Sequence, residues 1–109
     1  MRARTERGLA LKVMLVNGSP HQGGCTNRAL EEVAATLREE GINAEIFWIG
    51  GKPVGGCMGC GGCRKLGRCV YDDAVNSFRQ KAAEADGFVF GAPVHYAHAA
   101  SSLLGFMDR

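Results

Sequence analysis

The sequence predicts an α/β fold in which a parallel sheet is covered by helices on both faces. The first observation behind this prediction is three short apolar runs fit for buried strands, at residues 9–16, 43–49 and 87–92. The second is that a helix-compatible pattern follows each run, beginning near residues 26, 73 and 101. Because strands and helices alternate, right-handed crossovers are expected to join parallel strands.

The first strand and the helix after it carry different apolar patterns. Residues 9–16 are apolar on both sides, with Lys12 as the only charge, as expected of a central strand. Over residues 26–40 the apolar side chains recur at helical spacing and form one stripe, made of Leu30, Val33, Ala34 and Leu37. Gly41 ends this helix.

The middle of the chain combines one strand, one glycine-rich loop and one helix. The Ile, Phe and Trp side chains of residues 43–49 favour a strand, and Trp48 is expected in its core. Residues 50–68 hold half of the 16 glycines, so no regular element is predicted there. Asp72 and Asp73 offer N-caps for the second helix. Its inner face is predicted to consist of Val75, Phe78, Ala82 and Ala85.

The third strand leads into a loop that the fold places beside the loop after the first strand. Residues 87–92 are followed by the loop 93–98, and the last helix is predicted to begin near Ser101 and to continue through Arg109. In parallel sheets ligands bind at the carboxyl ends of the strands, where strand order reverses. The loops after the first and third strands are therefore expected to meet there. Together they predict a site for a phosphorylated ligand with a flat ring system.

Length, composition and charge exclude several classes of protein. With 109 residues the chain has room for one domain, and its 46% hydrophobic and 22% charged residues are those of an ordinary globular protein. No apolar run is long enough to span a bilayer and no signal peptide is recognised, so a cytoplasmic location is expected. Residues 1–10 are predicted to be a disordered leader whose arginines supply the net charge of +2. The remainder is neutral, so neither nucleic acid nor a membrane surface is an expected partner.

The glycine-rich turn after the first strand has the residues of an anion pocket. Its glycines, at positions 18, 23 and 24, let the backbone approach a ligand, and Ser19 and Thr26 supply hydroxyl donors. The helix that follows presents unpaired amides. Lysine is missing where a Walker A loop needs it, the dinucleotide pattern G-x-G-x-x-G is absent, and no Cys-x5-Arg phosphatase loop occurs. A single phosphate is therefore predicted, and the alternative is a turn that only joins strand to helix.

Four of the five cysteines form a compact motif, Cys57, Cys60, Cys63 and Cys69. Three thiolates on so short a loop, with a fourth close by, are typical of [4Fe-4S] ligation, and glycines at 59, 61 and 62 let the loop fold round a cluster. Zinc sites more often pair two Cys-x2-Cys knuckles a dozen or more residues apart, which leaves zinc as the alternative. The crowding does not fit a disulfide framework spread through a secreted fold.

These motifs, in this order, resemble those of the flavodoxin-like FMN reductases and, among them, the iron-sulfur flavoproteins. The likeness covers residues 11–109 and includes Gly-Ser-Pro-His-Gln-Gly-Gly-Cys-Thr, the cysteine motif, Gly-Ala-Pro-Val-His-Tyr-Ala and the closing Phe-Met-Asp-Arg. It implies FMN as cofactor. The residues expected around the FMN phosphate are Ser19, His21, Cys25, Thr26 and Asn27, with Cys25 standing where family members often carry Asn. The residues expected along the isoalloxazine edge are Pro93, Val94, His95 and Tyr96, whereas His98 is expected in solvent.

The resemblance implies an FMN-dependent oxidoreductase that carries electrons from NAD(P)H, through a [4Fe-4S] cluster, to a small-molecule or protein acceptor such as a flavin, a quinone or a redox partner. No side chain need act as acid or base, because the flavin N5 does the chemistry. Two alternatives stay open. One is a ferredoxin-linked iron-sulfur flavoprotein that carries electrons without nicotinamide, and the other is a small zinc-binding interaction module.

The resemblance also implies a five-stranded sheet in the order 2-1-3-4-5 within a three-layer α/β/α arrangement. The chain supplies the three strands expected in the order 2-1-3, so it looks truncated, and residues 11–109 are predicted to be the N-terminal part of a flavodoxin-like FMN-binding domain. The third strand would be an open edge with unpaired backbone groups. A homodimer or homotetramer that covers this edge is therefore expected.

Overall fold

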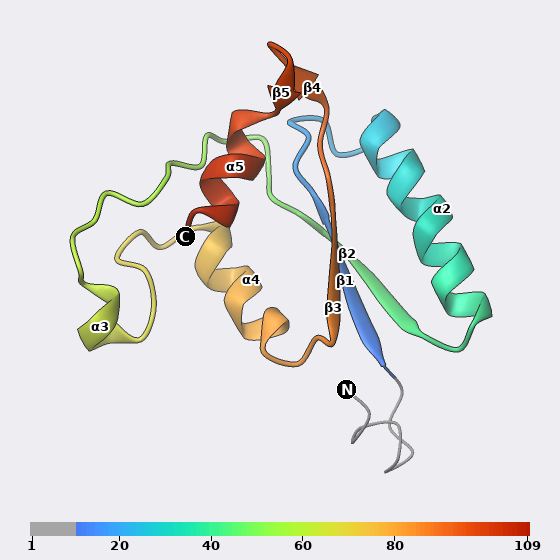
Figure 1. The fold of residues 1–109 in the computed structure, drawn as a ribbon, viewed down its shortest axis with the longest axis horizontal. Coiled ribbons are helices and arrows are strands. Elements are labelled where there is room, and N and C mark those ends of the chain that lie inside the picture. The colour runs from blue at the N-terminus through green and yellow to red at the C-terminus, as the bar shows by residue number, and fades with distance from the viewer. Residues whose placement is uncertain (1–10) are drawn as a thin grey trace.

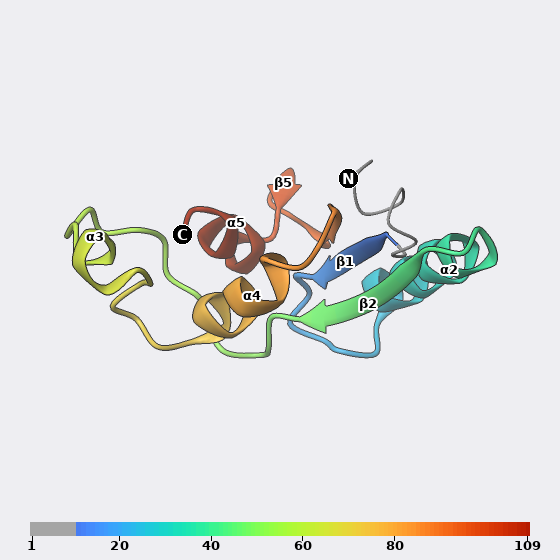
Figure 2. The same ribbon diagram turned by 90° about the horizontal axis from the view of Figure 1, so that it is seen from below.

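The computed structural model describes residues 11–109 and confirms the three-layer α/β/α arrangement (Figure 1). The predicted leader, residues 1–10, lies outside the described residues. In order along the chain the elements are β1 (Lys12–Asn17), α2 (Cys25–Glu39), β2 (Asn43–Trp48), α3 (Cys63–Leu66), α4 (Ala74–Ala82), β3 (Gly87–Gly91), β4 (Val94–His95), β5 (His98–Ala99) and α5 (Ser101–Met107). Figure 2 shows α2 at one end of the molecule and the loop that carries α3 at the other.

β1 is the central strand of a parallel three-stranded sheet in the predicted order, β2-β1-β3. Leu15 of β1 pairs with Ile46 of β2 on one side and with Val89 of β3 on the other. Met14, Leu15 and Val16 have no exposed surface, which explains the unbroken apolar run of this strand. Within residues 11–109, β3 has a strand partner on one side alone, so the predicted open edge is present.

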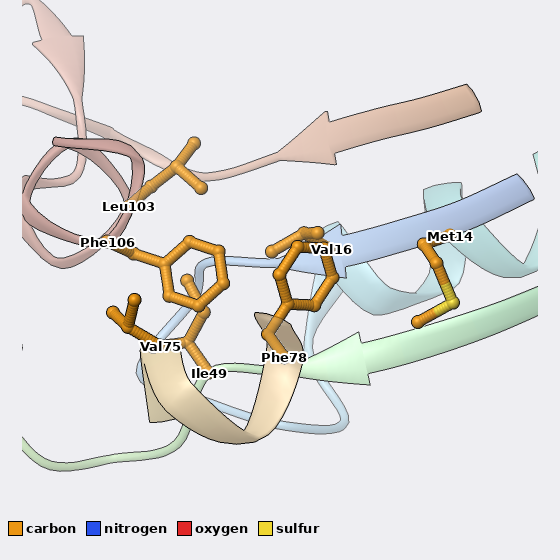
Figure 3. Packing of buried hydrophobic residues seen from close by; sticks show 7 residues of the cluster. All are labelled: Met14, Val16, Ile49, Val75, Phe78, Leu103 and Phe106. Atoms are coloured by element: carbon orange, nitrogen blue, oxygen red, sulfur yellow. The ribbon is translucent and has the colours of Figure 1, made fainter. Parts of the chain in front are cut away.

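Alternate residues of β1 contribute to two separate cores. Leu15 packs with Leu30 and Ala34 of α2. Met14 and Val16 belong to a second cluster, formed with α4 and α5 on the opposite face of the sheet (Figure 3). That cluster consists of Met14, Val16, Ile49, Val75, Phe78, Leu103 and Phe106, and the predicted inner face of α4 takes part in it. The two helices are locked together at its centre, where Phe78 and Phe106 meet edge to face with ring centroids 5.1 Å apart.

Two segments that the sequence predicts to be irregular contain short elements. Residues 50–68 include α3, a single turn that ends at Gly67 with φ 71°, the left-handed conformation that glycine adopts most readily. The loop 93–98 contributes to the hairpin β4–β5, in which Tyr96 and Ala97 reverse the chain at φ 51° and 69°. Such reversals usually contain Asn-Gly or Gly-Gly. This one contains neither, which is why the sequence pattern did not predict it.

Two helix ends can be compared directly with the prediction. Asp73 caps α4 as predicted, and its carboxylate accepts a hydrogen bond of 3.2 Å from the Val75 amide. α5 ends at Met107 instead of continuing through Arg109. Within residues 11–109 no helix has the length and apolar character needed to cross a membrane.

Candidate functional site

The loops after β1 and β3 meet at one edge of the sheet, as the sequence predicts. The Gly18 amide donates a hydrogen bond of 2.8 Å to the Gly91 carbonyl at the end of β3. A Cβ added to Gly91 would lie 3.2 Å from the Thr26 methyl group, so the first turn of α2 also packs against this strand end. Residues 18–26 are called the phosphate loop below. In Figure 1 the phosphate loop and the β4–β5 hairpin lie at the same end of the sheet.

Asn17 organises the phosphate loop from within the core, where its side chain has no exposed surface. Its Oδ1 accepts a hydrogen bond of 2.9 Å from the Ser19 amide, and its Nδ2 donates one of 3.2 Å to the Gln22 carbonyl. The Ser19 hydroxyl accepts another, of 3.1 Å, from the His21 amide. A buried amide side chain that satisfies backbone groups on both sides of a turn fixes that turn before any ligand arrives.

The start of α2 leaves hydrogen-bond donors free. Among residues 11–109, the amides of Cys25, Thr26 and Asn27 have no acceptor, and the N-cap residue Gly24 has no side chain to cap them. The first turn carries no acidic side chain that could compete with an anion. Free amides at the positive end of a helix dipole are the usual protein site for a phosphate. The predicted phosphate contacts belong to the phosphate loop and the first turn of α2, and their binding role stays a prediction.

Two glycines of the phosphate loop, Gly18 and Gly23, have different surroundings. A Cβ added to Gly18 would lie 2.7 Å from the Leu103 Cβ and 3.3 Å from the Gly91 carbonyl oxygen. Gly18 therefore lets α5 approach the loop, and its role in ligand approach stays a prediction. An added Cβ at Gly23 would meet nothing within 4 Å, so the backbone there faces open space, as a ligand-binding turn requires.

Trp48 supports the same loop from the end of β2. Its Nε1 donates a hydrogen bond of 2.9 Å to the Ser19 carbonyl, and its ring is half-buried. The prediction that Trp48 is a core residue is therefore incomplete. Through its indole N–H, Trp48 also fixes the backbone of Ser19, a predicted phosphate contact.

The predicted ring contacts occupy the base and the tip of the β4–β5 hairpin. Pro93 is half-buried, and its carbonyl accepts a hydrogen bond of 3.1 Å from the Ala100 amide. Val94 and Tyr96 are 75% and 96% exposed, and His95 is exposed as well. These side chains have free surface to offer a flat ring, and that contact stays a prediction. His98 is exposed as predicted.

The four motif cysteines line one cavity of about 720 Å³. It is enclosed partly by residues 54–71, called the cysteine loop below. The Gly59 amide donates to the Cys57 sulfur at 3.3 Å and the Gly62 amide to the Cys60 sulfur at 3.4 Å, an arrangement that suits thiolate ligands. Within residues 11–109, no three His, Cys, Asp or Glu side chains come close enough together to hold a metal ion. Cluster ligation by this loop therefore stays a prediction.

Asn76 of α4 fixes the backbone around the fourth motif cysteine. Its Oδ1 accepts a hydrogen bond of 3.2 Å from the Cys69 amide, while its Nδ2 donates to the carbonyls of Cys69 and Tyr71 at 3.1 and 3.0 Å. The side chain is 9% exposed. Sequence reasoning missed both Asn76 and Asn17, because a single Asn belongs to no motif. The available signal was the position of each Asn, because Asn17 ends the apolar run of β1 and Asn76 lies among the apolar residues of α4.

An ion pair joins the start of α4 to Arg109. The Arg109 guanidinium contacts both carboxylate oxygens of Asp73, one of them at 3.0 Å, and its side chain is only 2% exposed. Hydrogen bonding by Arg109 lowers the pKa of Asp73 below its ordinary value of 3.8. Hydrogen bonding to the Asp73 carboxylate raises the pKa of Arg109. The Arg109 guanidinium is therefore charged, and its two Nη atoms pair with the two carboxylate oxygens of Asp73.

The same residues match a known protein family and its members. The family described as NADPH-dependent FMN reductase matches residues 11–109. An iron-sulfur flavoprotein of Methanocaldococcus jannaschii is 34% identical over 99 residues, which cover 91% of this chain and 51% of that protein. Iron-sulfur flavoproteins of Archaeoglobus fulgidus and Methanosarcina thermophila are each 28% identical over 91% of this chain, and the matches cover 45% and 52% of those proteins. The chain thus spans about half the length of the curated relatives it matches. No solved structure matches it.

Proposed function

We propose, from the premise that this chain belongs to the NADPH-dependent FMN reductase family, that it binds FMN and transfers electrons from NAD(P)H to an acceptor. The observation that carries the proposal is the phosphate loop, whose free helix amides stand beside the end of β3 before any ligand is bound. FMN supplies the hydride and electron chemistry when it is bound. The protein supplies position and electrostatics.

In this proposal two loops bind different parts of FMN, one the phosphate and the other the flat ring. The amides of Cys25, Thr26 and Asn27, with the helix dipole behind them, favour the negative charge of a phosphate. On the hairpin, Val94 and Tyr96 offer exposed apolar surface to a flat ring. In this proposal the side chains bind and orient, and none is required to move a proton.

Replacing one predicted phosphate donor tests the FMN site. Thr26→Val keeps the methyl group that packs near Gly91 but removes the hydroxyl. Loss of one hydrogen bond to a charged phosphate is expected to weaken FMN binding about tenfold or more, measured by fluorescence titration. Thr36→Val is the matched control, because its hydroxyl bonds only the Glu32 carbonyl farther along the same helix. Equal FMN affinity for both variants and wild type would contradict the site.

Rapid mixing separates the reductase from an electron carrier. FMN-loaded protein is mixed anaerobically with NADH or NADPH, and flavin absorbance is followed. Bleaching by either nucleotide is the result expected of a reductase. If neither nucleotide bleaches the flavin but a reduced ferredoxin does, the second candidate function, a ferredoxin-linked electron carrier, replaces the first.

We propose that Cys57, Cys60, Cys63 and Cys69 hold a [4Fe-4S] cluster, and that the protein works in the cytoplasm, where these thiols stay reduced. The support is that all four line one cavity and that two already accept backbone N–H bonds at sulfur. Iron and acid-labile sulfide assays on anaerobically purified protein are expected to give both elements. Zinc without sulfide or flavin would instead favour the zinc-binding interaction module.

We also propose that the chain forms a homodimer or homotetramer. The support is the open edge of β3, where Phe88 and Phe90 stack 6.2 Å apart and remain 43% and 41% exposed. Sedimentation equilibrium is expected to give two or four copies per particle. A folded monomer over the whole concentration range would count against this assembly.

A further inference from the structure

The cysteine loop is held on its N-terminal side by residues 108 and 109. The Cys57 amide donates a hydrogen bond of 2.8 Å to the Asp108 carboxylate. Arg109 Nη1 donates one of 3.0 Å to the Gly55 carbonyl. Both contacts join residues more than fifty positions apart in the sequence, so nothing in the local chain geometry enforces them. They fix the chain at the first motif cysteine and two residues before it.

The same guanidinium holds the loop on its C-terminal side. Arg109 lies over the Tyr71 ring, with its central carbon 4.9 Å from the ring centroid. It also pairs with both oxygens of Asp73 at the start of α4. A single buried side chain therefore contacts the chain before the motif, at Gly55, and after it, at Tyr71 and Asp73. The two ends of the cysteine loop are fixed to one another through Arg109.

The Nε–H of Arg109 takes part in none of these hydrogen bonds. Its Nε is buried and, among residues 11–109, has no hydrogen-bond partner. Arg109 lines the cavity that the four motif cysteines line. A buried N–H without a partner is costly, and the cavity that Arg109 shares with the motif cysteines offers sulfur as an acceptor for its hydrogen bond.

We propose that Arg109 and Asp108 are positioning residues that hold the two ends of the cysteine loop together over its cavity, with the Arg109 Nε–H directed to a sulfur in that cavity. Arginine suits this role because its planar fork presents five donors in fixed directions. Lysine has neither a planar fork that pairs side by side with the two oxygens of Asp73 nor an Nε–H to direct to sulfur. Assigning a metal to the cavity sulfurs rests on the proposed function, whereas the holding of the loop does not.

The holding of the loop is tested on the full chain without FMN or iron. Alkylation of Cys69 is followed by mass spectrometry, with Cys25 on α2 as an internal reference, and hydrogen exchange is followed for residues 55–72. Arg109→Met is expected to raise both Cys69 alkylation and loop exchange about tenfold and to leave Cys25 unchanged. The matched control is Arg38→Met, because Arg38 also bonds a backbone carbonyl, that of Ala44, but lies at the far end of α2.

Two results would overturn the loop-holding role. Rates for Arg109→Met within twofold of wild type would show that the loop keeps its place without the guanidinium. Equal acceleration at Cys25 and Cys69 would show general unfolding. Asp108→Ala is a second variant that should not unfold the protein, because Asp108 is exposed. Its removal should speed hydrogen exchange of the Cys57 amide, while alkylation of Cys69 keeps its wild-type rate.

The Nε–H is tested by reconstituting the protein with iron and sulfide. Arg109→Lys is expected to bind less iron per chain and to shift the midpoint potential to more negative values, because a donor to sulfur is lost. Arg38→Met should match wild type in both measurements. An unchanged potential at full iron content would overturn this part of the proposal. If wild type itself binds neither flavin nor iron, the proposed function fails, while the exchange and alkylation results still decide the role of Arg109 and Asp108.

Discussion

Gly105 of α5 is the position where one added carbon should displace the cysteine loop. A Cβ on Gly105 would lie 2.4 Å from the Val54 carbonyl oxygen and 3.3 Å from the Gly55 carbonyl carbon. Ordinary contacts between non-bonded heavy atoms are about 3.5 Å, so Gly105→Ala requires a separation of about 1 Å. Because the obstructing atoms are backbone, no side-chain rotation relieves the contact.

The loop is expected to move, not the helix. α5 is fixed by Leu103 and Phe106 in the core cluster, whereas residues 54 and 55 belong to an irregular segment. Overpacking of this kind costs about 1–3 kcal/mol, and replacing glycine by alanine within a helix returns about 1 kcal/mol, so the net loss of stability is about 0–2 kcal/mol. The larger effect should be on the loop contacts made by Asp108 and Arg109.

Urea unfolding and hydrogen exchange of residues 55–72 measure the two effects separately. Gly105→Ala should unfold at slightly lower urea and exchange faster in the loop, with FMN affinity unchanged. Gly55→Ala is the matched control, because an added Cβ there meets nothing within 4 Å. If Gly105→Ala weakens FMN binding and leaves loop exchange unchanged, α5 has shifted toward Gly18 instead, and the reasoning is refuted.

Two further predictions concern the supports of the two loops. Trp48→Phe keeps an aromatic ring, although a smaller one, and removes the bond to the Ser19 carbonyl. FMN affinity should therefore fall about fivefold by fluorescence titration, since one hydrogen bond is worth about 1 kcal/mol. Asp73→Asn keeps a capping oxygen but removes the charge paired with Arg109, so it should be less stable than wild type at neutral pH. Because the folded pKa of Asp73 is depressed, the wild-type advantage is present above its ordinary value of 3.8 and is lost as pH falls below that value. Urea midpoints measured from about pH 6 down to about pH 3 should therefore converge, and a constant difference would contradict the assignment.

The parts of the fold that sequence reasoning predicts are those with a local signal. The central position of β1 in the sheet follows from its unbroken apolar run, and the phosphate loop follows from glycine and hydroxyl residues placed before a helix. Asp73 was predicted as a cap because capping needs only the next few residues. In each case the determining contacts lie within one element or its immediate flanks.

The contacts that fix the cysteine loop carry no such signal. Arg109 reaches Asp73 across 36 positions and Gly55 across 54, and Asp108 reaches Cys57 across 51. Such pairs depend on where α5 lies against α4, which only the packed core determines. The packing of Gly18 against α5 carries no local signal either, because its neighbour Leu103 is remote in sequence.

α5 connects the two predicted redox sites mechanically. Near its start, Leu103 packs on Gly18, and the Ser102 hydroxyl donates a hydrogen bond of 3.3 Å to the Gly18 carbonyl. Just beyond its end, Asp108 and Arg109 hold the cysteine loop. Because α5 has 7 residues and rises about 1.5 Å per residue, it sets a spacing of about 10 Å between these two sets of contacts. Leu103 and Phe106 anchor it in the core, so a change in packing beneath α5 should displace both loops together.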